Sequence, residues 1–90
     1  MAMKKHILLA LLEDKPGVLN RMASVFRRRG FNIESVNVIE TEVGSDKLPH
    51  LTRVTIVVAG SANKLELVRK QLEKIVDVVK VSDITTEDKV

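Results

Sequence analysis

The chain has 90 residues and a formal net charge of +3, with 15 Lys and Arg against 12 Asp and Glu. This length builds one domain with a small core, to which self-association would add buried surface. The chain has no cysteine, which excludes disulfides, iron–sulfur clusters and zinc sites built from thiolates.

The composition also argues against a membrane or a nucleic acid as partner. No segment has the apolar length that spans a bilayer, and Met1–Lys5 lacks the features of a signal peptide, so we expect a cytoplasmic protein. The one dense basic cluster, Arg27–Arg29, stands where a helix should end and complements the helix dipole. Nucleic-acid binding usually needs aromatic residues that stack on bases, and the chain has only Phe26 and Phe31.

The first expected elements are a strand and an amphipathic helix. Residues 6–12 form a short apolar run, which predicts a central strand at least partly covered on both faces. Pro16 and Gly17 break this run. From Val18 the apolar residues recur with the period of a helix, and Gly30 is its expected end. The apolar stripe of this helix is Leu19, Met22, Ala23 and Phe26.

Two strands are expected next, separated by a loop over residues 42–49 that is rich in turn residues. In the strand over residues 31–39, the apolar alternation slips between Ile33 and Val36, which predicts a bulge near Glu34 and Ser35. The strand over residues 51–59 alternates regularly. Its apolar face consists of Thr52, Val54, Ile56 and Val58.

A second helix and a fourth strand complete the expected fold. The helix follows Gly60 and Ser61, and residues 78–84 supply the strand. The helix buries Leu65, Val68, Leu72 and Ile75. The element order predicts an α+β fold of the ferredoxin-like βαββαβ type, a four-stranded antiparallel sheet with two helices on one face. We place the domain at residues 4–85 and a polar tail at residues 86–90.

The connection between the first strand and the first helix, residues 13–19, has the chemistry of an amino-acid site. The ammonium of a free amino acid could meet Asp14. Its carboxylate could meet the N–H groups near Gly17 and Val18, where the helix dipole favours negative charge. The alternative is an ordinary connection in which Asp14 caps the helix and Pro16 lies in its first turn.

The sequence contains no pattern that indicates catalysis, a cofactor or a metal. His6 and His50 are the only histidines, and neither stands in a metal-ligand spacing. The chain has no nucleophile elbow, Walker A motif or dinucleotide-binding fingerprint. We therefore expect a protein that is not an enzyme and binds no cofactor.

Three blocks of this sequence, residues 11–19, 29–35 and 70–78, resemble ACT domains. These are ferredoxin-like modules that bind amino acids and regulate metabolic enzymes. Within that family, the blocks most resemble the regulatory small subunit of acetohydroxyacid synthase, also called acetolactate synthase. The first block occurs across many ACT proteins, whereas the second and third together are more discriminating.

The resemblance implies a homodimer or higher homo-oligomer, in which two domains pair side by side into an eight-stranded sheet. It also implies feedback control of an acetohydroxyacid synthase catalytic subunit by a branched-chain amino acid, typically valine, bound at the subunit interface. By position, the ligand site carries over to Asp14, Gly17, Val18, Leu19, Asn32 and Ile33.

Two departures from that family leave alternatives open. Many such subunits have an amide side chain where this chain has Asp14, so ligand preference can differ. They also usually continue into a second domain, whereas this sequence stops at Val90. The chain could instead be an interaction module that has lost ligand sensing and only stabilises a catalytic partner, or a stand-alone amino-acid sensor.

Overall fold

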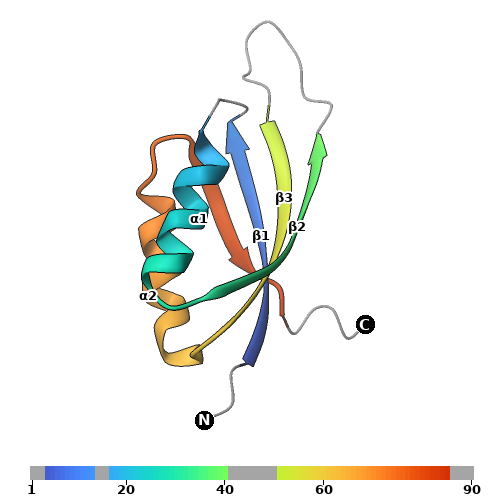
Figure 1. Ribbon diagram of the computed structural model, residues 1–90. Coiled ribbons are helices and arrows are strands. Elements are labelled where there is room, and N and C mark those ends of the chain that lie inside the picture. The colour runs from blue at the N-terminus through green and yellow to red at the C-terminus, as the bar shows by residue number, and fades with distance from the viewer. Residues whose placement is uncertain (1–3, 14–16, 41–50, 86–90) are drawn as a thin grey trace, which may run out of the picture.

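The computed structural model has six elements in the order β1–α1–β2–β3–α2–β4 (Figure 1). They are β1 (Lys4–Glu13), α1 (Val18–Arg28), β2 (Asn32–Glu40), β3 (Leu51–Gly60), α2 (Ala62–Glu73) and β4 (Val78–Asp83). The structure describes residues 4–13, 17–40 and 51–85. The predicted loop at 42–49, the predicted tail at 86–90 and Asp14 lie outside these ranges, so the domain limits stay a prediction.

The four strands form one antiparallel sheet in the order β2–β3–β1–β4. Both helices pack against the same face of this sheet (Figure 1). The central pair, β1 and β3, runs in register from Lys4 opposite Gly60 to Glu13 opposite Leu51. β2 and β4 are therefore the two edges. This arrangement confirms the predicted ferredoxin-like βαββαβ fold.

The predicted bulge in β2 is present at Glu34. Ile33 lies opposite Val58 of β3, and Ser35 lies opposite Val57, so Glu34 is the extra residue of the pair of strands. An inserted residue reverses which side chains face each way along the rest of the strand. As a result Ile33 and Val36 both lie on the side of the sheet that carries the helices.

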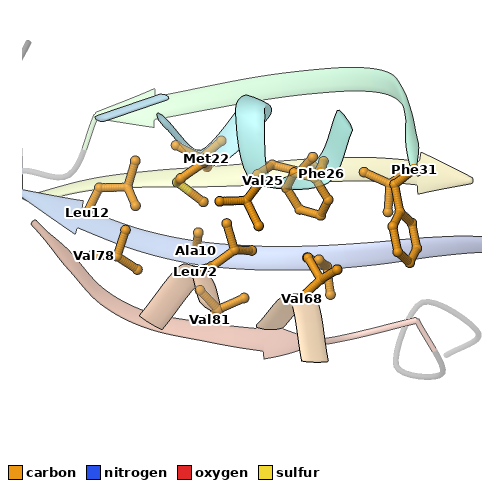
Figure 2. Close-up of a cluster of buried hydrophobic side chains, with 14 of the residues drawn as sticks. Ala10, Leu12, Met22, Val25, Phe26, Phe31, Val68, Leu72, Val78 and Val81 are labelled. Atoms are coloured by element: carbon orange, nitrogen blue, oxygen red, sulfur yellow. The ribbon is translucent and has the colours of Figure 1, made fainter. Parts of the chain in front are cut away.

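The core lies between the sheet and the two helices. Figure 2 shows side chains of α1 and α2 meeting those of β1, among them Met22, Phe26, Leu72 and Ala10, each at most 1% exposed. One detail of the predicted α1 stripe is wrong. Val18 is buried at 2% exposed, whereas Leu19 is 38% exposed, so the buried face of α1 begins one residue earlier than predicted.

α1 ends in a Schellman motif, which confirms the predicted end of this helix at Gly30. Gly30 has a φ of 83°, a conformation that glycine adopts without strain. Its N–H donates to the carbonyl oxygen of Arg27 at 3.1 Å, and the N–H of Phe31 donates to that of Phe26 at 2.9 Å. The chain reverses direction at Gly30 and places the side chain of Phe31 in the core. β2 begins at the next residue, Asn32, so the buried Phe31 fixes where this strand starts.

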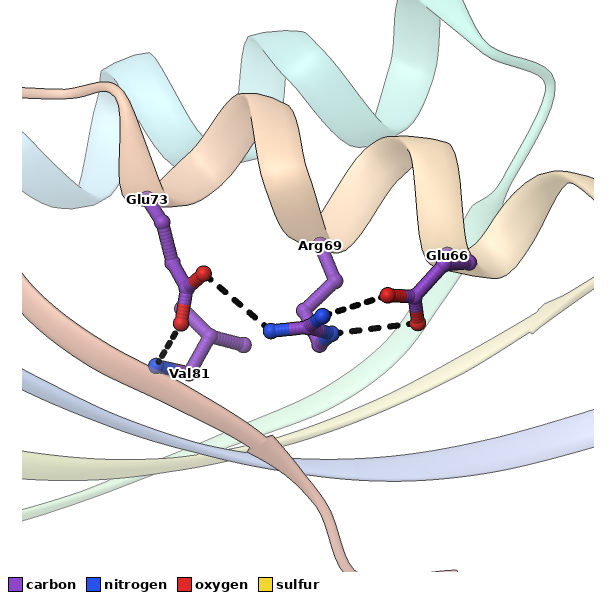
Figure 3. Close-up of polar contacts among 4 residues, drawn as sticks. All are labelled: Glu66, Arg69, Glu73 and Val81. Atoms are coloured by element: carbon purple, nitrogen blue, oxygen red, sulfur yellow. Dashed lines mark hydrogen bonds and ion pairs between the residues drawn. The ribbon is translucent and has the colours of Figure 1, made fainter.

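A polar network ties α2 to the edge strand β4 (Figure 3). Arg69 lies between Glu66 and Glu73 and donates hydrogen bonds to both, from Nε to Glu66 Oε1 at 3.2 Å and from Nη1 to Glu73 Oε1 at 3.1 Å. The hydrogen bond with Arg69 lowers the pKa of Glu66. The other oxygen of Glu73 accepts a hydrogen bond from the backbone N–H of Val81 at 3.1 Å. That N–H belongs to β4, so a side chain of α2 covers part of this edge of the sheet.

Candidate functional site

Gly17 stands at the start of α1 in a left-handed conformation, with φ at 85°. A Cβ atom built on Gly17 would meet nothing within 4 Å, so the space beside it is open. As the N-cap residue, Gly17 has no side chain that could cap the first turn of α1. The N–H groups of a first helical turn lack partners within the helix, and the dipole there favours an anion. The start of α1 can therefore bind a carboxylate through its backbone.

The segment that joins α2 to β4 contacts both the end of β1 and the first half of α1. The backbone N–H of Glu13 donates to the carbonyl oxygen of Asp77 at 2.8 Å. The carboxylate of Asp77, a residue only 7% exposed, lies 3.8 Å from Nη1 of Arg21 on α1. Sequence reasoning missed this role of Asp77. The signal that could have revealed it is an acidic residue flanked on both sides by valines, Val76 and Val78.

An apolar groove of about 240 Å³ lies between α1 and β2. Leu19 and Ala23 form its helix side, whereas Ile33 and Val36 form its strand side. This explains why Leu19 is exposed, because its side chain lines the groove instead of entering the core. The groove brings Leu19 and Ile33, two of the predicted site residues, to one place. The remaining lining residues are Asn20, Met22, Phe26 and Ile56.

Asn32 lies far from Gly17 within one chain. Asn32 starts β2 opposite Ala59, at the end of the sheet where β1 begins, whereas Gly17 follows the other end of β1. The 11 residues of α1 separate them, a length of about 16 Å at 1.5 Å per residue. The side chain of Val18 is buried in the core, so only its backbone can face a ligand. The structure thus places Gly17 and Asn32 at opposite ends of the molecule, whereas Leu19 and Ile33 line one groove.

The two edges of the sheet differ in what covers them. At β4, Glu73 bonds the outward N–H of Val81. β2 pairs only with β3 among the described residues, and it exposes Val36, Val38 and Ile39 to 48%, 49% and 49%. An exposed apolar edge strand is a template for pairing with another strand. The groove beside Leu19 opens next to this edge.

The described ranges contain no group of three or more His, Cys, Asp or Glu side chains that could hold a metal ion. Neither helix within those ranges is long and apolar enough to cross a bilayer.

A family model described as "AHAS small subunit-like ACT domain" matches residues 8–80, where AHAS stands for acetohydroxyacid synthase. The chain belongs to this family. Over 79 residues it is 49% identical to the probable acetolactate synthase small subunit of Methanothermobacter thermautotrophicus, a match that covers 88% of this chain and 44% of that protein. Over 90 residues it is 44% identical to the acetolactate synthase small subunit of Mycobacterium bovis, covering 100% of this chain and 51% of that protein.

This ACT domain therefore spans about half the length of the curated relatives it matches. Among solved structures, it resembles the acetolactate synthase small subunit of Thermotoga maritima, with a TM-score of 0.68 and 40% identity over 89% of this chain and 47% of that one. It also resembles the ACT domain of GTP pyrophosphokinase from Chlorobium tepidum, with a TM-score of 0.68 over 90% and 97% of the two chains. At 17% identity, this second likeness shows the fold alone.

The two left-handed glycines allow a matched test of the start of α1. Gly17 and Gly30 have φ angles of 85° and 83°, and a Cβ atom on either would meet nothing within 4 Å. Gly17→Ala and Gly30→Ala should therefore each lower the free energy of unfolding by about 1–2 kcal/mol through backbone strain alone. Urea unfolding followed by circular dichroism measures this loss. A Gly17→Ala variant as stable as the wild type would contradict the geometry described for the start of α1.

Proposed function

We propose that this ACT domain is a regulatory module without catalytic activity of its own, which binds a branched-chain amino acid, valine first among them, between two copies of the chain. Through this ligand it controls the catalytic subunit of acetolactate synthase. The observation that supports the proposal is the division of the site, with Gly17 at one end of the molecule, Asn32 at the other, and the open edge of β2 between them.

Antiparallel pairing of β2 with β2 of a second copy would reunite the two halves. Such a pair is related by a two-fold axis, so each chain presents the same surface to the other. Because the second strand runs in the opposite direction, the end that carries Gly17 in one chain comes beside the partner's Asn32. The dimer then holds two equivalent sites, and neither site is complete within one chain.

The residues that meet in this arrangement suit a free aliphatic amino acid. The N–H groups at the start of α1 favour its carboxylate. The side-chain amide of Asn32 is exposed and can both donate and accept hydrogen bonds. Leu19 and Ile33 offer apolar surface to a branched side chain. Asp14, which lies outside the described residues, remains our proposed partner for the ammonium group.

A ligand held between two chains acts on how they associate. It binds the paired state and not the separate chains, so it shifts the equilibrium toward the pair in proportion to that difference in affinity. A catalytic subunit that contacts the same dimer would respond to the shift. The relatives' name, acetolactate synthase small subunit, supports this choice of partner.

Ligand binding is tested by calorimetric titration with valine, leucine and isoleucine. The wild-type chain should bind at least one of them saturably. Asn32→Ala should weaken binding about tenfold or more, because it removes hydrogen bonds to a charged ligand. Asn63→Ala, the same change at an exposed position of α2 away from the β2 edge, should leave affinity within twofold. No heat from any of the three ligands at millimolar concentration would refute ligand binding and leave an interaction module that does not sense amino acids.

Pairing through β2 is tested by sedimentation equilibrium of two charge insertions. Val38 on β2 and Val79 on β4 are exposed to 49% and 52%, so neither substitution disturbs the core. Val38→Glu should yield monomers and abolish valine binding, because it places two carboxylates at the junction of the two copies. Val79→Glu should remain a dimer. A Val38→Glu variant that associates as strongly as the wild type would exclude the β2 edge as the interface.

A further inference from the structure

The sheet face opposite the helices is the second surface that the described residues leave uncovered (Figure 1). Leu8, Ala10 and Leu12 point into the core, so the alternate residues of β1 point the other way. These are Ile7, Leu9 and Leu11, and each is half-buried between its neighbours on the adjoining strands. Val57 of β3 lies opposite Ile7. Together these side chains make an apolar stripe along the middle of the sheet.

Two cations border this stripe at one end. Arg53 on β3 and Lys80 on β4 both lie opposite Leu11, one on each side, so the three residues form a row across the sheet. Both cations are exposed, and neither makes an ion pair with a carboxylate of the described residues. Neighbouring strands lie about 4.8 Å apart, which separates the Arg53 and Lys80 backbones by about 10 Å. One carboxylate entering between them can meet both.

The row contains a hollow of about 200 Å³. Leu9 and Leu11 contribute apolar side chains to it, and Arg53, Lys80 and the hydroxyl-bearing Ser82 contribute polar ones. An apolar surface beside two cations is complementary to a segment with an apolar stripe and an acidic residue. Glu13 alternates with Leu11 along β1 and lies on this same face, but the two cations outnumber it at this end of the sheet. Two copies of the face would therefore repel each other, and charge complementarity favours a different protein that brings an acidic residue.

We propose that this face docks an amphipathic helix of the acetolactate synthase catalytic subunit, whose apolar residues pack on Leu9 and Ile7 and whose Asp or Glu enters between Arg53 and Lys80. Alternate residues of a strand are about 6.7 Å apart, and residues i and i+4 of a helix are about 6 Å apart along its axis, so residues at this spacing on a helix laid along β1 match successive rows. This inference rests on the proposed function for the identity of the partner. It concerns a different surface from the amino-acid site.

The test measures binding of the whole chain to the purified catalytic subunit of the same organism by biolayer interferometry. The double variant Arg53→Glu, Lys80→Glu should lose at least tenfold in affinity. The matched control Lys64→Glu, Lys70→Glu makes the same change of charge at two exposed positions of α2, and it should bind within twofold of the wild type. Circular dichroism verifies that both variants fold.

Equal affinity of the Arg53, Lys80 variant and the wild type would overturn the inference, and so would a wild-type chain that does not bind the catalytic subunit. Valine titration of the same samples keeps the two proposals separate. Normal valine binding with equal affinity for the catalytic subunit refutes the docking face and leaves the amino-acid site standing. A tenfold loss of docking in a chain that binds none of valine, leucine and isoleucine supports the docking face and refutes the amino-acid site.

Discussion

The open edge of β2 is the constraint on which the proposed function of this domain depends. A strand at a sheet edge presents unpaired backbone groups, and here it also exposes Val36, Val38 and Ile39. The opposite edge is treated differently, since Glu73 covers the N–H of Val81 and is itself held by Arg69. Among the described residues, one edge is thus covered and the other is open to pairing. Association through β2 would bury its apolar side chains and assemble the divided site in one step.

Most of the fold prediction depended on the periodic spacing of apolar residues along the sequence. The alternation of β3, the helical spacing of α1 and α2, and Gly30 at the end of α1 each depend on residues close in sequence, so the chain alone reveals them. The slip between Ile33 and Val36 predicted a bulge near Glu34 and Ser35, and the register places it at Glu34. The error at Leu19 has a tertiary cause. Nothing in the helical period distinguishes a side chain in the core from one that lines a groove at its margin.

The site was less accessible to sequence reasoning, because its parts are related by topology. Residues 13–19 suggested amino-acid chemistry locally, and family resemblance added Asn32. Only the sheet register reveals that Asn32 and Gly17 lie at opposite ends of one chain. The contacts of Asp77 with Glu13 and Arg21 join segments far apart in sequence. The hydrogen bond from the N–H of Val81 to Glu73 joins neighbouring elements, but it depends on how α2 lies over β4.

Mixing two defective variants tests most directly whether the amino-acid site is shared between chains. Gly17→Leu and Asn32→Ala, each folded by circular dichroism, should each bind no valine or bind it weakly. After exchange of subunits, a mixed dimer contains one site with both an intact Gly17 and an intact Asn32. Random pairing should therefore restore about a quarter of the wild-type sites at wild-type affinity. A mixture that binds no better than its components would contradict a site built from two chains.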